Sequence, residues 1–207
     1  QVHTLALDLT APETFGQVVE EATALWGGLD VLVNNAGYGL SGAAEETTAI
    51  QLRAQMETNF FGLALLTQQV LPVMRRQQSG YIINVASVAG LRGFRGMSAY
   101  CASKFAVVGY SEALAQELTP FGIRVSIVEP GPYRTDWAGA SLEKTVQMRN
   151  ADAHSPYAVL NQALGDMMRN ADGHQPGDPL QIAEVLFAAA RAPEPPVHMI
   201  FGDEAIK

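Results

Sequence analysis

The stretch VLVNNAGYGLSG, residues 31–42, places an apolar run before three glycines with the spacing G-x-G-x-x-G. The same spacing occurs in the turn that binds a dinucleotide's phosphates, where a second strand follows within about 30 residues and an acidic side chain follows about 20 residues on. Here the next strand is predicted only at residues 81–86, and Ser87 follows it. Glu57 has the right separation from Gly37 but lies within a predicted helix. The spacing is therefore interpreted as incidental, and the stretch as a strand followed by a glycine-rich turn.

Strands and helices alternate along the whole chain. Runs rich in valine, isoleucine and leucine predict strands, and apolar residues at helical spacing predict the helices between them. The predicted strands cover residues 2–8, 30–35, 81–86, 123–129 and 197–201, and the predicted helices cover residues 13–26, 47–78, 98–119 and 178–192.

Two further expectations concern the irregular parts of the chain. The helix over residues 47–78 is predicted to be interrupted near Thr58 and Asn59, and again at Pro72. Between residues 133 and 177 we expect one or two helices and no strand.

This alternation predicts an α/β fold, a doubly wound parallel sheet of the Rossmann type with helices on both faces. Because no linker, repeat or low-complexity tract divides the sequence, residues 1–207 are expected to form a single domain. In such sheets ligands bind beyond the carboxyl ends of the strands. The chemistry is therefore expected at Asp8 and at residues 34–42, 87–96 and 130–135.

Composition excludes several classes of function. A hydrophobic content of 48% with 16% charged residues is typical of an ordinary globular domain. No apolar run approaches the roughly 20 residues of a membrane span, and no secretory signal is visible, so we expect a cytoplasmic protein without a membrane partner. A formal net charge of -8 argues against a nucleic-acid partner. The single cysteine, Cys101, cannot form an internal disulfide, and the four histidines lack metal-like spacing, so no metal site is expected.

Three side chains have a chemical reason to meet. Tyr100 and Lys104 lie one turn apart near the start of a predicted helix, and Ser87 ends a strand shortly before them. The lysine ammonium is expected to bring the pKa of the tyrosine toward neutrality, and the serine hydroxyl to hydrogen-bond a carbonyl oxygen. Because neither residue carries a hydride, this chemistry implies a nicotinamide cofactor. Singly, Ser87 could instead cap a turn, Asn59 bend a helix and Asp8 form a turn.

Five motifs follow one another in a fixed order: NNAG at residues 34–37, Asn59 in METNFFG, Ser87 in NVASVAG, Tyr100 and Lys104 in YCASK, and Pro130, Gly131 and Thr135 in PGPYRT. The ordered set resembles the compact single-domain branch of the short-chain dehydrogenase/reductase family. By this resemblance the protein is an NAD(P)-dependent oxidoreductase that interconverts a carbonyl compound and a secondary alcohol. The resemblance makes Tyr100 the catalytic acid/base and lets Ser87 position the substrate and Asn59 hold a water of the proton relay.

The resemblance also implies a cofactor site for NAD or NADP. It assigns to that site Asp8 near the adenine, the backbone around Asn35, Ala36 and Gly37 along the adenosine, Lys104 at the nicotinamide ribose and Thr135 at the carboxamide. Tyr100, Pro130 and Gly131 are assigned to the cofactor site as well. The family chooses between NAD and NADP with residues of its first turn and second strand. Neither has a counterpart here, so the preference stays undecided.

The family's opening strand, its Thr-Gly-x-x-x-Gly-x-Gly turn, the following helix and the second strand have no counterpart in these 207 residues. The predicted strand over residues 2–8 corresponds to the family's third strand and would lack its neighbours in the sheet. We therefore expect a fragment of a longer protein, or a sheet with a shifted edge, and weakened cofactor binding by this segment alone.

The region over about 136–177 corresponds to the family's substrate lid. Its apolar residues favour a lipophilic ketone, aldehyde or secondary alcohol; alternatively they pack against the domain. The helices over about 59–78 and 98–119 correspond to those at the family's dimer interface, so a homodimer or homotetramer is expected. Two other interpretations are a catalytically silent binding or regulatory protein on this fold, and a sugar-nucleotide epimerase or dehydratase, which the short region after Thr135 disfavours.

Overall fold

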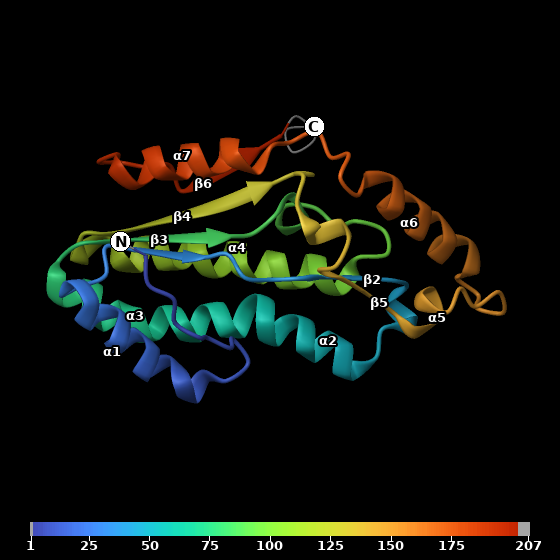
Figure 1. The fold of residues 1–207 in the computed structure, drawn as a ribbon, viewed down its shortest axis with the longest axis horizontal. Coiled ribbons are helices and arrows are strands. Elements are labelled where there is room, and N and C mark those ends of the chain that lie inside the picture. The colour runs from blue at the N-terminus through green and yellow to red at the C-terminus, as the bar shows by residue number, and fades with distance from the viewer. Residues whose placement is uncertain (1, 203–207) are drawn as a thin grey trace.

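A parallel sheet of four strands forms the centre of the protein, described here from a computed structural model over residues 2–202 (Figure 1). Its strands are β1 (Val31–Asn34), β3 (Gly80–Val85), β4 (Ile123–Pro130) and β6 (His198–Phe201), in the spatial order β1-β3-β4-β6. Every pairing in this sheet is parallel. The predicted parallel α/β fold is confirmed, and each of these strands begins and ends within one residue of its predicted bounds.

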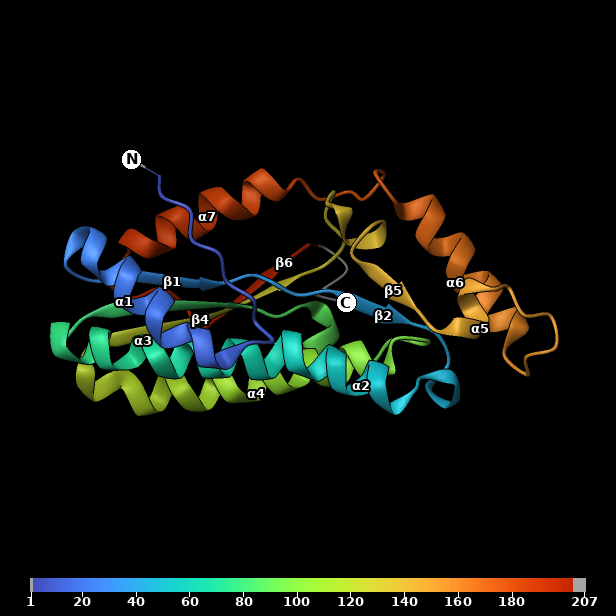
Figure 2. The ribbon, with the colours of Figure 1, turned by 60° about the horizontal axis from the view of Figure 1, so that its bottom comes forward.

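Helices cover both faces of the sheet, as Figures 1 and 2 show from two directions. Helices α1 (Phe15–Trp26), α3 (Leu63–Gln77) and α4 (Ser98–Leu118) pack on one face, and α7 (Pro179–Arg191) packs on the other. The sheet is therefore wound on both sides, as the alternation of strands and helices predicts.

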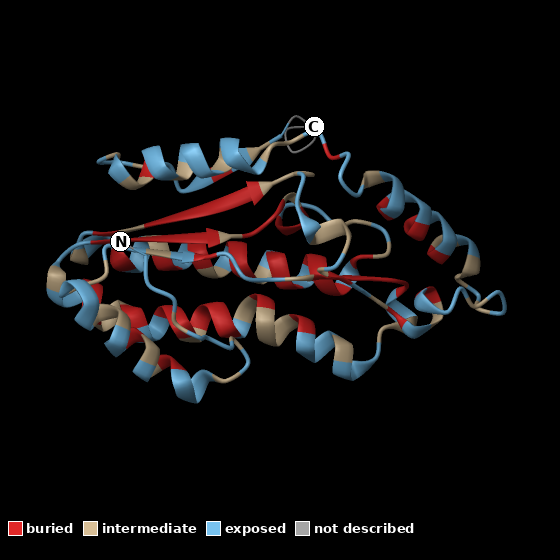
Figure 3. Ribbon diagram, viewed as in Figure 1, coloured by how far each residue is buried: buried red, intermediate tan, exposed pale blue. Residues whose placement is uncertain are grey.

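The two faces are built by alternate residues of the central strands. Ile82 and Val125 contribute to the core shared with α1, α3 and α4, whereas Ile83 and Val128 pack against α7. Figure 3 shows the result: β3 and β4 are almost wholly buried, and the outer surfaces of the helices are exposed. A buried parallel strand needs apolar residues on both sides, which explains their near-continuous apolar sequence.

The long helical segment after β1 is interrupted where the sequence predicts. Helix α2 (Ala49–Met56) is followed by one π-helical stretch, η3 (Glu57–Gly62), before α3 begins. Asn59 lies in this stretch and is buried. The predicted interruption near Thr58 and Asn59 is confirmed.

The second predicted interruption, at Pro72, is wrong. Pro72 lies inside α3, which continues to Gln77. Proline removes one backbone hydrogen bond, but Val70, Val73 and Met74 on the same helix are buried in the core. Their packing keeps the helix continuous across the missing bond.

The predicted strand over residues 2–8 is also wrong. This segment makes no strand pairing, and Val2 and Leu7 are exposed. Alternation of apolar residues yields a strand only where a sheet edge and a core lie beside it. The chain instead enters the core at Leu9, whose side chain packs against the cluster formed by α1, α3 and the sheet.

The prediction of no strand between residues 133 and 177 is contradicted by a second, two-stranded sheet. Strand β2 (Gly39–Ser41) pairs in parallel with β5 (Leu142–Lys144). Three-residue strands are too short to produce a periodic signal in the sequence. The remaining elements are η1 (Pro12–Thr14), η2 (Ala44–Glu46), η4 (Val88–Gly90), η5 (Thr119–Phe121), η6 (Asp136–Ala138), α5 (Val146–Arg149) and α6 (Ala158–Ala171).

A buried network of polar side chains connects the sheet to α3 and α4 by hydrogen bonds. The Asn34 amide donates hydrogen bonds to Thr67 on α3 (3.0 Å) and to Asn84 on β3 (2.8 Å). The Asn84 amide in turn donates to the Ser111 hydroxyl on α4 at 2.8 Å. Buried networks of this kind fix a unique arrangement of the elements that they join.

The substitution Asn84→Leu should lower the free energy of unfolding by about 1–3 kcal/mol, because the Asn34 and Ser111 groups each lose a buried hydrogen-bond partner. Urea denaturation followed by circular dichroism measures this. Asn170→Leu, on the exposed side of α6, is the matched control and should change stability little. An unchanged or higher stability of Asn84→Leu would show that the network does not stabilise the fold.

Candidate active site

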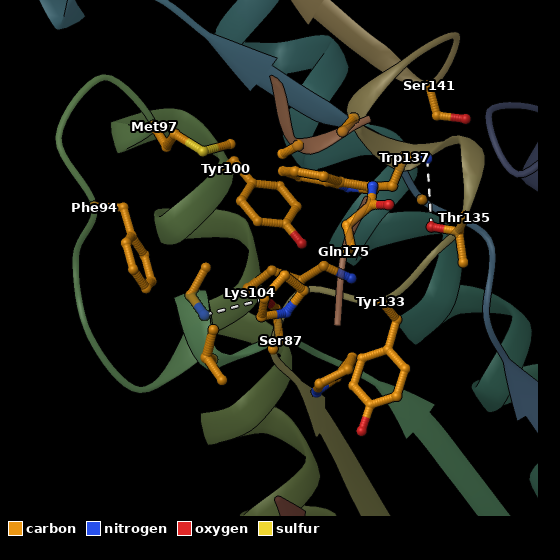
Figure 4. Close-up of a pocket in the computed structure, with 18 of the residues that line it drawn as sticks. Ser87, Phe94, Met97, Tyr100, Lys104, Tyr133, Thr135, Trp137, Ser141 and Gln175 are labelled. Atoms are coloured by element: carbon orange, nitrogen blue, oxygen red, sulfur yellow. Dashed lines mark hydrogen bonds between the residues drawn. The ribbon is translucent and has the colours of Figure 1, made fainter. Parts of the chain in front are cut away.

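A cavity of about 1090 Å³ lies beyond the carboxyl ends of β1, β3 and β4, where the fold predicts it. Its walls come from the loops after these strands and the first turns of α4 (Figure 4), and also from α6 and α7. Of the residues predicted from the sequence, the cavity is lined by Asn35, Gly37, Ser87, Tyr100, Lys104, Pro130, Gly131 and Thr135. Asp8, Ala36 and Asn59 do not line it.

Tyr100 projects from the first turn of α4 and is 6% exposed. Burial raises the pKa of its hydroxyl to about 12, and a hydrogen bond with the Ser87 side chain acts in the opposite direction. The indole of Trp137 lies against the phenol ring, with 5.2 Å between the ring centroids. Tyr100 therefore keeps its proton at neutral pH in this structure.

Lys104 lies one turn further along α4 and is 5% exposed. Its Nζ donates a hydrogen bond to the Val85 carbonyl oxygen at 2.8 Å and lies 5.9 Å from the centre of the Tyr100 ring. Burial lowers the pKa of its ammonium to about 8. The expectation that this ammonium brings the Tyr100 pKa toward neutrality is wrong for this structure, because burial, which disfavours the phenolate, is the largest influence on this pKa and raises it.

Ser87 follows β3 and begins the short helix η4. Its Oγ accepts a hydrogen bond from the Ala89 backbone N–H at 3.1 Å, so the serine does cap a turn. The same side chain is hydrogen-bonded to Tyr100. A turn-capping role for Ser87 is therefore compatible with the expectation that its hydroxyl binds a carbonyl oxygen.

The side-chain amide of Asn59 is occupied by protein groups. Its Oδ1 accepts from the Tyr38 backbone N–H (3.1 Å), and its Nδ2 donates to the Tyr38 carbonyl (2.9 Å) and to the Ser103 hydroxyl (3.1 Å). A methyl group added to Gly37 would lie 3.1 Å from Asn59 Oδ1 and 3.6 Å from Lys104 Nζ. Asn59 therefore fixes the turn that forms one wall of the cavity beside Lys104.

Asp8 lies in an exposed turn away from the cavity. Its Oδ1 accepts hydrogen bonds from the Thr10 backbone N–H (2.8 Å) and hydroxyl (2.7 Å). The backbone hydrogen bond from Thr10 is the main cause that lowers the pKa of the Asp8 carboxyl. The structure does not bring Asp8 together with the other predicted residues, because the strand expected to end there does not form.

Helix α6, in the segment over about 136–177, contributes apolar side chains from one of its sides to the cavity wall. Those that line it are Leu160, Ala163, Leu164, Met167, Met168 and Ala171. The start of α6 is held to η2, where the Asn161 amide donates to Glu46 at 2.8 Å and the Tyr157 hydroxyl donates to Glu45 at 2.6 Å. Thr135 caps η6 through a hydrogen bond from the Trp137 N–H.

Among the residues of the cavity that sequence reasoning did not single out are Met97 and Gln175, whereas Phe94 lies in the stretch over residues 87–96 where the chemistry is expected. Gln175 is the most unusual of these, since it is 6% exposed and its Oε1 has no hydrogen-bond partner within residues 2–202. It lies in an irregular connection after α6. A single glutamine in a loop gives no periodic or motif signal, so only the fold reveals its position.

Within the part of the chain that the structure describes, no group of three or more histidine, cysteine, aspartate or glutamate side chains could hold a metal ion. In the same residues, no helix combines the length and hydropathy that a membrane crossing requires.

A parallel sheet with helices on both faces and a cavity beyond the carboxyl ends of its strands defines the Rossmann-type class of α/β proteins. Residues 1–146 match the profile of the family described as short chain dehydrogenase. The chain belongs to the short-chain dehydrogenase/reductase family.

Two relatives illustrate the sequence similarity. Oxidoreductase BOA17 of Botryotinia fuckeliana is 35% identical over 207 residues, which cover 100% of this chain and 73% of that protein. A 3-ketodihydrosphingosine reductase of Bacteroides thetaiotaomicron is 46% identical over 135 residues, 65% of this chain and 50% of that protein. The matches thus span between half and three quarters of the length of these relatives.

Solved structures show the same fold. A short-chain dehydrogenase from Streptomyces avermitilis superposes with a TM-score of 0.84 at 36% identity, covering 98% of this chain and 72% of that one. A family member from Burkholderia phymatum in complex with NAD gives 0.80 at 25% identity, over 95% of this chain and 69% of that one. ElxO with NADP bound gives 0.71 at 26% identity, over 94% and 73%.

The buried ammonium predicts a particular dependence of stability on pH. Unfolded Lys104 keeps its proton up to its ordinary pKa of 10.5, whereas the folded protein releases it near pH 8. Between these two pKa values the folded state binds fewer protons than the unfolded state. The free energy of unfolding therefore increases as pH rises through this window and decreases as pH falls. Between pH 8 and pH 10 the gain should be about 2 kcal/mol.

Lys104→Met should lack this gain, and the difference in unfolding free energy between wild type and variant should follow the same pH window. Lys144→Met, which removes a lysine outside the cavity, is the control. Denaturant titrations at several pH values measure the effect. Parallel pH profiles of wild type and Lys104→Met would contradict the burial of the ammonium.

Proposed function

We propose that the protein is an NAD(P)-dependent oxidoreductase that interconverts a lipophilic carbonyl compound and a secondary alcohol, with Tyr100 as the acid/base. The observation that carries this proposal is the convergence of Ser87, Tyr100 and Lys104 at the strand ends, on the wall of an otherwise largely apolar cavity. Membership of the short-chain dehydrogenase/reductase family and neighbours solved with NAD and NADP support it.

The proton chemistry follows from the protonation states. The Ser87 hydroxyl hydrogen-bonds the substrate oxygen and orients the carbonyl. Tyr100, whose pKa is about 12, is a proton donor matched to the strongly basic alkoxide that forms when a carbonyl is reduced. Lys104, charged below its pKa of about 8, stabilises the phenolate left behind. In the opposite direction the same phenolate would accept the proton of the alcohol.

The residues of the cavity fit the nicotinamide and ribose of the cofactor, which supplies the hydride. Lys104 has three N–H donors, and the hydrogen bond to Val85 uses one, so the others are suited to ribose hydroxyls. Pro130 and Gly131 line the wall against which a flat ring would pack, and the exposed Thr135 is suited to the carboxamide.

On the adenosine side the proposal assigns Asn35, Ala36 and Gly37, which form an exposed turn after β1, and also Asp8, which the described fold leaves in a separate turn. NAD and NADP both remain in the proposal, since the neighbours include complexes with each. Asn59 would serve the proton relay from its main chain, because its side chain is engaged with Tyr38 and Ser103.

We also propose that residues 1–207 form one domain with a substrate lid over about 136–177. The proposed location of the protein is the cytoplasm. A homodimer or homotetramer would form through the outer faces of η3, α3 and α4, where Phe61 and Phe105 are 45% and 47% exposed. The substrate would be a small lipophilic molecule, since α6 presents an apolar wall to the cavity.

Tyr100→Phe should lower kcat/KM about 10²–10⁴-fold, because it removes the proton donor while keeping the ring that packs on Trp137. Reduction of a long-chain methyl ketone with NADH and with NADPH, followed by cofactor absorbance, measures this. Tyr110→Phe, on the same helix and packed against Phe60 outside the cavity, should change the rate little.

Two outcomes would redirect the proposal. Equal rates for wild type and Tyr100→Phe would exclude the tyrosine mechanism. Cofactor binding without turnover of any carbonyl compound would favour the alternative, a catalytically silent binding or regulatory protein on this fold.

A further inference from the structure

One polar side chain in the cavity wall has no role in the chemistry described above. Gln175 is more than nine-tenths buried, lines the cavity and leaves its Oε1 without a hydrogen-bond partner within residues 2–202. Among the residues that the structure describes, four others have a buried side-chain atom without a hydrogen-bond partner, but none of them lines the cavity: Ser41, Gln55, Gln147 and Asn161. Gln175 is thus distinguished by being both unsatisfied and placed where a ligand would lie.

An unsatisfied buried amide is unfavourable, since it has lost its water without gaining a partner. The loop around Gln175 does not need the side chain to hold its shape. The Arg134 guanidinium donates hydrogen bonds to the Gln175 and Pro176 carbonyl oxygens at 3.0 Å each, and the Arg134 backbone N–H donates to the Gly177 carbonyl at 2.9 Å. These contacts with Arg134 therefore fix the backbone of the loop, and the side-chain amide of Gln175 is not needed for this.

The surroundings of this amide indicate what it binds. In Figure 4 the Gln175 side chain points into the cavity between Tyr100 and Thr135. It follows α6, whose contribution to the cavity wall is apolar, including Leu164 and Met168. It therefore lies beside the apolar wall formed by α6, between Tyr100, to which we assign the proton chemistry, and Thr135, to which we assign part of the cofactor site.

We propose that Gln175 is a specificity-determining residue that hydrogen-bonds a second oxygen function of the substrate, close to the reacting carbonyl. This inference rests on the proposed function and narrows its substrate class to lipophilic hydroxyketones or diketones and the corresponding diols. A glutamine amide both donates and accepts, so it can bind either a hydroxyl or a carbonyl group. A site built to hydrogen-bond such a group discriminates against the analogue that lacks it.

The test compares a long-chain methyl ketone with derivatives that carry one hydroxyl group one, two or three carbons from the carbonyl. Wild type should prefer at least one hydroxyketone. Gln175→Leu should lower kcat/KM for that substrate about tenfold to a hundredfold and leave the plain ketone within about twofold. Gln175→Met, which keeps an unbranched chain, should behave like Gln175→Leu. The control Gln147→Leu removes another unpartnered glutamine outside the cavity and should leave the preference unchanged.

Two further readouts separate the possible failures. Titration with NADH and NADPH should give the same Kd for wild type and Gln175→Leu, and the preferred hydroxyketone should raise the Tm of wild type but not of Gln175→Leu. An equal loss on plain and hydroxylated ketones, or weaker cofactor binding, would overturn the inference while leaving the oxidoreductase proposal intact. A hydroxyketone that raises Tm through Gln175 without turnover would support the site and reject the oxidoreductase proposal.

Discussion

The hydrogen bond from Lys104 to the Val85 carbonyl joins the start of α4 to the end of β3, and the site depends on this link. It is reinforced by a close backbone contact, since a methyl group added to Gly90 would lie 2.8 Å from the Lys104 carbonyl oxygen. The turn that carries Ser87 is thereby pressed against the helix that carries Tyr100. The hydroxyl groups of Ser87 and Tyr100 meet because the backbone segments that carry them are packed in close contact.

Burial of this pair has an electrostatic consequence. Both charged forms are disfavoured, so the tyrosine pKa rises to about 12 and the lysine pKa falls to about 8. A surface lysine and tyrosine would not be shifted in this way. The fold therefore gives up part of its stability to bury these two groups, and shifted pKa values of this kind are common at functional sites.

Much of the sheet and site could be predicted from the sequence because the signals are local. Buried strands such as Ile123–Pro130 are apolar runs, and Tyr100 with Lys104 share a helix face through their spacing alone. The wrong prediction of a strand over residues 2–8 and the unpredicted pairing of β2 with β5 have the same physical reason. Whether a short extended segment becomes a strand depends on the edge that the rest of the fold offers it, and that edge is not encoded in its own residues. The pKa of Tyr100 was misjudged likewise, because burial is a property of the assembled cavity.

The residues that we propose for the chemistry lie on α4 and at the strand ends, where regular geometry fixes them. Gln175, which we propose for substrate selection, lies in an irregular loop whose backbone is held by Arg134. The loop after α6 can change its side chains without disturbing Ser87, Tyr100 or Lys104, since their positions are set by the contact between β3 and α4. The residues that we propose for the chemistry and the residue that we propose for substrate selection thus lie on separate elements. A change of substrate on this fold should therefore require changes in the lid before any change in the strand-end residues.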